Sequence, residues 1–229
     1  SPFLPSFLSL LLFLLLFFFF VIFYFLLACA AANFAMATQL DGTEYHDVFP
    51  VWDWWLVPGT TARYGNAPDT CSHYPGDPHC DACVKNVTHT SFAAGVFDYT
   101  NGAAAMDLLN PADDIHLYKS AFFFQDSFLA AGAPLSAAAP RLASLPVTTA
   151  IEQRLLAGPV TVWLSNQTAP VVMPANNTWR VPASLVSAVF HGNTGYFFPP
   201  WAPRADSAVI SNQQRFGSWY LITQGNAER

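Results

Sequence analysis

The sequence predicts a mostly β protein, an antiparallel β-sandwich preceded by a hydrophobic helical leader. Two observations support this fold class. After residue 37, short runs of β-branched and aromatic residues alternate with Pro, Gly and Asn, and long segments with helical periodicity are scarce. Residues 1–36 carry no charged side chain and consist mainly of Phe, Leu and Ala. Short strands at regular spacing are typical of a sandwich or meander, so we expect a leader at 1–36 and a β-sandwich domain at 37–229.

The leader exceeds the length needed to span a bilayer, because residues 7–32 are almost entirely apolar and about 20 such residues suffice. It lacks the basic start and the short apolar core of an ordinary signal peptide, although residues 28–37 supply small residues suited to cleavage. Three interpretations remain open: a signal segment, a membrane anchor through residues 7–32, or translated non-coding sequence. We expect the sequence to be incomplete at both ends, because it begins with Ser1 and stops at Arg229 just after a predicted strand.

The strands expected in the domain are short apolar runs bounded by turn residues. They lie at residues 120–125, 159–164, 169–174, 187–192, 195–199 and 218–223. Residues 191–195 predict a hairpin loop, because their glycines can adopt positive φ.

Composition argues against a nucleic-acid partner. Charged residues make up 10% of the chain, the net charge is −6, and Lys and Arg form no cluster that could neutralise phosphates. Sequons at Asn86, Asn166 and Asn176 indicate exposed loops of a glycoprotein. We therefore expect an extracellular location, either secreted or membrane-anchored with the domain outside.

Cysteine usage leaves the chemistry of one loop open. Cys71, Cys80 and Cys83 predict a disulfide among them if the compartment is oxidising. With His73 and His79 they would alternatively form a zinc set, but the second C-x2-C pair of a zinc ribbon is missing. Reduced, inert thiols are the third interpretation. We predict no metal site and no cofactor.

Motifs for nucleophilic or nucleotide chemistry are absent from the sequence, which contains no G-x-S-x-G, no P-loop and no G-x-G-x-x-G after a strand. His116 and His191 are isolated and are interpreted as structural or surface residues. Lys119, beside the aromatic run at 120–125, is interpreted as a cation at the entry of a strand.

The segment from Glu44 to Thr61, EYHDVFPVWDWWLVPGTT, combines three tryptophans with acidic residues and a Pro-Gly turn. Tryptophan faces stack on pyranose rings while carboxylates bind hydroxyls, so the segment suits a carbohydrate site. Trp52 and Trp54 alternate as on a strand, which favours a shared face in the core, with Trp55 on the opposite side.

The block EYHDVFPVWDW, followed by PGTT, resembles the signature of polysaccharide lyase family 8, the hyaluronate, chondroitin AC and xanthan lyases. Later stretches look similar in the same order, although Ala121 stands where the family usually has Trp. They lie at residues 105–108, 119–124, 146–149, 152–154, 191–197 and 215–219. The resemblance covers roughly residues 40–224 and implies part of the family's central supersandwich domain.

The resemblance implies cleavage of acidic polysaccharides by β-elimination at a uronic acid. Glu44 matches the family's catalytic Glu, and Asp47 stands where a substrate-side Asn is common. Trp55 is assigned to substrate binding. In that family the remaining catalytic groups belong to an N-terminal α/α domain that we expect to be missing. The chain, by resemblance a carbon–oxygen lyase, is therefore expected to be inactive alone. Alternatives are a non-catalytic carbohydrate-binding module and a truncated gene product without independent function.

Overall fold

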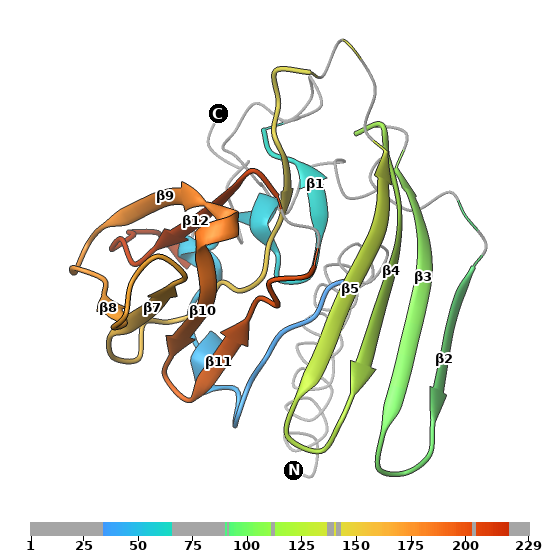
Figure 1. Cartoon of the computed structure of the whole chain (residues 1–229), viewed down its shortest axis with the longest axis horizontal. Coiled ribbons are helices and arrows are strands. Elements are labelled where there is room, and N and C mark those ends of the chain that lie inside the picture. Colours follow the sequence, from blue (N-terminus) through green and yellow to red (C-terminus); the bar gives the residue numbers. More distant parts are fainter. Residues whose placement is uncertain are drawn as a thin grey trace, which may run out of the picture. The chain divides into compact units, whose positions relative to one another are not determined.

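The computed structural model of the chain describes residues 34–65, 90, 92–110, 113–136, 140, 143–202 and 205–219 (Figure 1). These residues form two compact units. The first comprises the described parts of Ser1–Ala37 and Asp53–Gln153, and the second those of Thr38–Trp52 and Arg154–Arg229.

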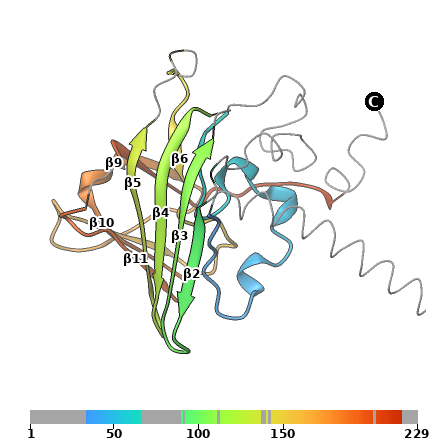
Figure 2. The ribbon, with the colours of Figure 1, turned by 90° about the vertical axis from the view of Figure 1, so that its right-hand side faces the viewer.

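The first unit is built on a four-stranded antiparallel sheet, with strand order β2-β3-β4-β5. Its strands are β2 (Ala93–Phe97), β3 (Gly102–Asn110), β4 (Ile115–Phe123) and β5 (Phe128–Ser136). They run side by side in both views (Figures 1 and 2). A separate antiparallel pair joins β1 (Thr61–Arg63) to β6 (Val147–Thr149).

Side chains alternate in burial across this sheet, as the period of two along a strand requires. Leu108, Ile115 and Leu117 are buried on one face and pack with Val147 of β6. Tyr118, on the other face of β4, is exposed. The core of this unit therefore lies on one side of the sheet.

The second unit is a small two-layer sandwich. A four-stranded antiparallel sheet has the order β11-β10-β7-β8, and β12 pairs with β9. The strands are β7 (Val160–Leu164), β8 (Val171–Val172), β9 (Thr178–Pro182), β10 (Val186–His191), β11 (Thr194–Phe197) and β12 (Ser207–Ser211). Side chains from both sheets meet in one core, formed by Val160, Val162, Met173 and Val186 with Trp179, Val181, Ala208 and Ile210 packed against them.

The mostly β, antiparallel class expected from the sequence is confirmed, and so are the strands near 120–125, 159–164, 187–192 and 195–199. The run at 169–174 forms only the two-residue β8. The predicted hairpin closes through Gly192 at φ 60. Residues 218–219 are not strand, and 220–223 lie outside the described residues.

Residue patterns alone did not predict strands β2, β3 and β5, because Ala and Gly make up much of AAGVF, GAAAMDLLN and FLAAGAPLS. These residues have low intrinsic strand propensity. Long-range pairing in the sheet overrides that propensity, with nine cross-strand partners between β3 and β4 alone.

The prediction of a strand around Trp52 and Trp54 is wrong. This part of the chain forms three 3₁₀ turns, η1 (Thr43–Tyr45), η2 (Phe49–Val51) and η3 (Trp54–Leu56). Pro50 occupies the start of η2, where its missing N–H costs nothing. The Asp53 carboxylate accepts a hydrogen bond from Trp55 N and so begins η3. Local capping therefore replaces strand pairing here.

Several predictions fall on residues that the structure does not describe. The leader is outside the described residues up to position 33, as are Cys71, Cys80, Cys83 and Asn86. Within the part that is described, no helix has both the length and the apolar character needed to cross a bilayer. The domain limits at 36 and 37 stay a prediction.

Lys119 is not the strand-entry cation that the sequence indicated. It lies in the middle of β4 and is buried, with 6% of its surface exposed. Its Nζ donates a 2.5 Å hydrogen bond to the carbonyl of Gly59. Burial lowers the pKa of Lys119 to about 7, because the charged amine loses its hydration.

We predict that the free energy of unfolding rises with pH between about 7 and 10.5. In this window the unfolded chain holds a proton on Lys119 that the folded chain releases, so raising the pH favours the folded state. Each pKa unit corresponds to about 1.4 kcal/mol, and the rise should reach a few kcal/mol. Denaturant unfolding at a series of pH values measures it.

Lys119→Met should remove most of this rise, whereas Lys85→Met, at the only other lysine in the sequence, should retain it. An unchanged slope in Lys119→Met would contradict the assignment.

Candidate functional site

Glu44 is fixed by the loop that carries it. Its carboxylate accepts hydrogen bonds from Leu40 N at 2.7 Å and from Gly42 N at 3.0 Å, one on each oxygen. Gly42 adopts φ 91 at the start of η1, which brings its N–H toward the side chain. The bond from Leu40 N is the main reason that the pKa of Glu44 is lowered. The side chain is therefore a fixed, ionised carboxylate.

The backbone of Glu44 is tied to the second unit's sheet. Its carbonyl accepts a 2.9 Å hydrogen bond from Leu155 N. The neighbouring Arg154 donates from Nη2 to the carbonyl of His191 at 2.8 Å, and Ala157 N donates to His191 Nε2 at 2.9 Å. These bonds give the buried His191 polar partners, and they connect the Glu44 loop to the end of β10.

Asp47 follows η1 and adopts the left-handed backbone conformation, with φ 54. Asp tolerates this region better than most residues do. One carboxylate oxygen accepts a 3.2 Å hydrogen bond from Trp219 Nε1, and the other lies 3.2 Å from His46 Nδ1. Asp47 and His46 are both well exposed. The acidic group thus stands at the surface with a neighbour on each oxygen.

Aromatic rings surround this loop. Phe49 and Trp52 stack with ring centroids 5.2 Å apart and an interplanar angle of 7°, and Tyr45 lies 6.1 Å from Trp52. Trp219 meets Phe49 edge to face at 6.2 Å and keeps 43% of its surface exposed. Such edge-to-face contacts add to the stabilisation from burial.

The segment at 215–219 lies directly on residues 47–51. Arg215 Nη1 donates to the carbonyl of Val51 at 3.4 Å. Gly217 packs so closely that a Cβ there would lie 1.8 Å from the carbonyl oxygen of Pro50. Only glycine fits at this position, and this close packing holds Trp219 beside Asp47.

Trp55, the predicted substrate-binding residue, belongs to the first unit and is 9% exposed. Its role stays a prediction. The adjacent Asp53 is structural: its Oδ2 accepts a 2.8 Å bond from Tyr64 Oη, and its backbone exchanges hydrogen bonds with the side chain of Gln153. Trp55 is therefore enclosed by an anchored turn.

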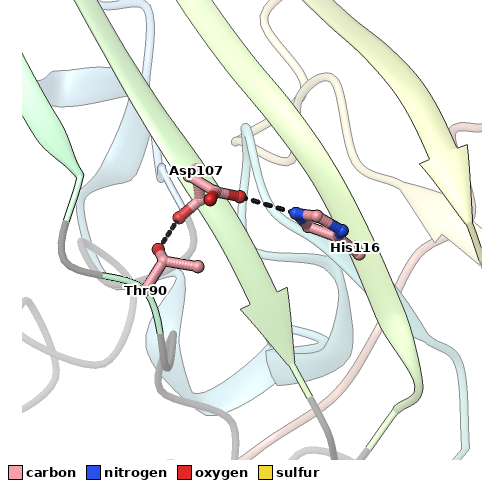
Figure 3. Close-up of polar contacts among 3 residues, drawn as sticks. All are labelled: Thr90, Asp107 and His116. Atoms are coloured by element: carbon pink, nitrogen blue, oxygen red, sulfur yellow. Dashed lines mark hydrogen bonds and ion pairs between the residues drawn. The ribbon is translucent and has the colours of Figure 1, made fainter.

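A second polar cluster lies on the sheet of the first unit (Figure 3). His116 Nε2 lies 2.8 Å from Asp107 Oδ1, across the strands β3 and β4. The hydroxyl of Thr90 donates to the main-chain carbonyl of Asp107 and not to the imidazole. This order of contacts is not that of a nucleophile, base and acid. The cluster is best explained as a cross-strand pair.

Metal ligands are not gathered in the described ranges, where no group of three or more His, Cys, Asp or Glu side chains could hold an ion. The cysteine-rich loop is outside those ranges, so its disulfide and its zinc alternative are not addressed.

Comparison with known proteins assigns the family. The model of the polysaccharide lyase family 8 super-sandwich domain matches residues 28–229. The chain belongs to polysaccharide lyase family 8. Chondroitinase-AC of Pedobacter heparinus is 28% identical over 195 residues, which cover 83% of the family 8 chain and 24% of that protein. The chain thus spans about a quarter of the length of this relative.

The family 8 chain brings Glu44 and Asp47 onto one short loop, as their spacing required. Sequence reasoning assigned no role to Trp219 or Arg215, because they follow Asp47 by almost the whole domain. The available signal was the block RFGSW at 215–219, which resembles the family but carried no residue roles.

The Glu44→Ala variant should loosen the loop. Losing both carboxylate acceptors should speed hydrogen exchange at the amides of Leu40 and Gly42 about three- to tenfold. Asp98→Ala is the matched control, because Asp98 accepts from Thr100 N and Asn101 N in another exposed turn. Exchange measured by NMR should change only near the altered residue. Unaltered exchange at Leu40 and Gly42 would contradict the described role.

The Gly217→Ala variant should displace the 215–219 segment, because its new Cβ cannot coexist with the carbonyl of Pro50. We expect a loss of roughly 1–3 kcal/mol in the free energy of unfolding and a shifted indole N–H resonance of Trp219. Gly132→Ala is the control, since its Cβ would make ordinary contacts at 3.4 Å and beyond. Equal, small effects in both variants would argue against close packing at Gly217.

Proposed function

We propose that the chain supplies the β-sandwich side of a polysaccharide lyase site, which cleaves an acidic polysaccharide by β-elimination at a uronic acid. The observation that carries this proposal is the family 8 match across residues 28–229, which includes the loop that holds Glu44 as an ordered carboxylate. The remaining catalytic groups would come from a helical domain outside this chain.

Because Glu44 is a fixed, ionised carboxylate, it is better suited to orient another catalytic side chain than to act as the base that abstracts a proton. β-Elimination requires neutralisation of the uronate, removal of the C5 proton and protonation of the leaving oxygen. A general base works best when its pKa lies near the working pH, whereas backbone hydrogen bonds, above all the one from Leu40 N, hold the pKa of Glu44 below its usual value. A fixed anion of this kind suits hydrogen bonding to a catalytic side chain of the helical domain.

The substrate class follows from the relative's name and from charge. Chondroitin is an acidic polysaccharide, so a chondroitin- or hyaluronan-like uronan is the proposed substrate. The chain's own net charge of −6 does not attract a polyanion, so the helical domain would supply most of the positive potential. A non-catalytic carbohydrate-binding module is the second candidate, favoured by the half-exposed Trp219 beside Asp47.

We also propose an extracellular location. Asn166 and Asn176 both lie in exposed turns, where a glycosyltransferase can reach them. Asn176 Oδ1 accepts a 3.1 Å bond from Gln214 N, so Asn166 is the better acceptor of the two. The membrane anchor at 7–32 stays a prediction.

A chimera tests the lyase proposal. Residues 38–229 replace the matched region of Pedobacter heparinus Chondroitinase-AC, and ultraviolet absorbance follows the unsaturated uronate product. We expect the chimera to be active, the chain alone to be inactive, and Glu44→Gln to lower kcat/KM of the chimera roughly a hundredfold. The Gln side chain has one acceptor oxygen and one NH₂ donor, so its two terminal atoms cannot both accept hydrogen bonds. Glu44→Gln therefore perturbs the loop and removes the negative charge of the side chain.

The control for this experiment is Asp98→Asn, a neutralised carboxylate in another turn, which should keep full activity. Turnover by the chain alone, or full activity of the Glu44→Gln chimera, would refute the proposed division of labour.

A further inference from the structure

We propose that Trp219 is a saccharide-stacking residue of this site and that Arg215, on the same segment, pairs with the uronate carboxylate. This inference rests on the proposed function, because it names the groups that would hold the acidic sugar next to Glu44. It starts from the contact between two segments that lie 172 positions apart, Trp219 Nε1 with Asp47 Oδ1.

The position of Trp219 is set at three points along its segment. Arg215 contacts Val51, Gly217 lies against Pro50, and Trp219 contacts Asp47 and Phe49. The two segments therefore run along each other over five residues. A segment held in this way presents its side chains in one orientation, which lowers the entropy lost on binding.

The indole is oriented and accessible. Its Nε1 is directed at Asp47 and its contact with Phe49 is edge to face, with an interplanar angle of 73°. Phe49 in turn stacks on Trp52. With 43% of its surface exposed, Trp219 has area to receive the apolar face of a pyranose ring.

The charges explain how an acidic sugar is tolerated beside Asp47. The carboxylate oxygens of Asp47 face the indole N–H and His46, so this group acts by orienting Trp219. Arg215 is exposed, and within the described part of the chain no carboxylate pairs with it. One N–H of Arg215 donates to the Val51 carbonyl. The other N–H groups of its guanidinium remain able to donate to a carboxylate.

Together these groups select the class of ligand. Stacking on Trp219 would serve any pyranose chain, whereas Arg215 would favour one that carries carboxylates. A uronic-acid oligosaccharide should therefore bind more tightly than a neutral one, and the two residues should contribute separately.

Binding of a short hyaluronan oligosaccharide and of a neutral cello-oligosaccharide to the full chain, measured by calorimetry, tests the inference. Trp219→Ala should weaken binding of both about tenfold, and Trp219→Phe should weaken it less. Arg215→Gln should weaken only the hyaluronan oligosaccharide. Asp47→Asn keeps an acceptor for the indole and removes a negative charge, so hyaluronan affinity should be kept or increased.

Matched controls come from the same unit. Trp201→Ala alters a tryptophan that is 78% exposed and makes none of these contacts, and Arg180→Gln alters an exposed arginine that bonds Ser207 instead. Both should bind like the unaltered chain. Equal affinities of Trp219→Ala and Trp201→Ala, or no binding by the unaltered chain, would overturn the inference.

The chimera separates this inference from the proposed function. If its turnover depends on Glu44 while Trp219→Ala leaves its KM unchanged, the lyase proposal stands and the Trp219 assignment fails. If the chimera is inactive but binding by the chain depends on Trp219, the assignment stands and the lyase proposal fails.

Discussion

The first unit depends on hydrogen bonds to the backbone N–H and carbonyl groups of one irregular turn, at residues 53–60. Residues 53 and 55–60 are buried or half-buried, and the turn belongs to neither a strand nor a long helix, so its polar groups need partners from elsewhere. Gln153 bonds the N–H and carbonyl of Asp53 and the carbonyl of Leu56. Gly59 donates to the carbonyl of Ala150 and accepts from Lys119. The turn is therefore held to the strand β4 and to the segment after β6.

The backbone conformation and the close packing of this turn require glycine at position 59. Its φ is 83, and a Cβ would lie 2.5 Å from Met36 N. Met36 N itself donates to the carbonyl of Pro58. The buried Lys119 is the partner of the Gly59 carbonyl although burial lowers its pKa, and the amine keeps N–H groups to donate after it has lost a proton.

In the second unit, the loop of the candidate site likewise depends on hydrogen bonds and contacts to hold its conformation. The loop around Glu44 and Asp47 has no strand of its own, and its conformation is held by the Glu44 carboxylate, by Leu155 N and by the 215–219 segment. The sheets behind it supply rigidity. Functional side chains on an irregular loop that a sandwich supports keep precise geometry while they remain accessible.

Prediction from sequence succeeded where the signal is local. Strands of the second unit are rich in β-branched residues, and the hairpin at Gly192 follows from turn chemistry. Residue patterns alone missed the alanine-rich strands β2, β3 and β5, whose pairing decides their structure, and the burial of Lys119, which no local pattern shows.

Local motifs and composition were enough to predict the family, the mostly β class and the close spacing of Glu44 and Asp47. The contacts of Trp219 with Asp47 and of Gln153 with Asp53 span 172 and 100 positions, and they could be seen only in the folded chain. The physical reason is that capping, turn geometry and alternation act over a few residues and leave a trace in the local pattern. Contacts between distant segments depend on how the sheets fold back, which no short stretch of sequence records.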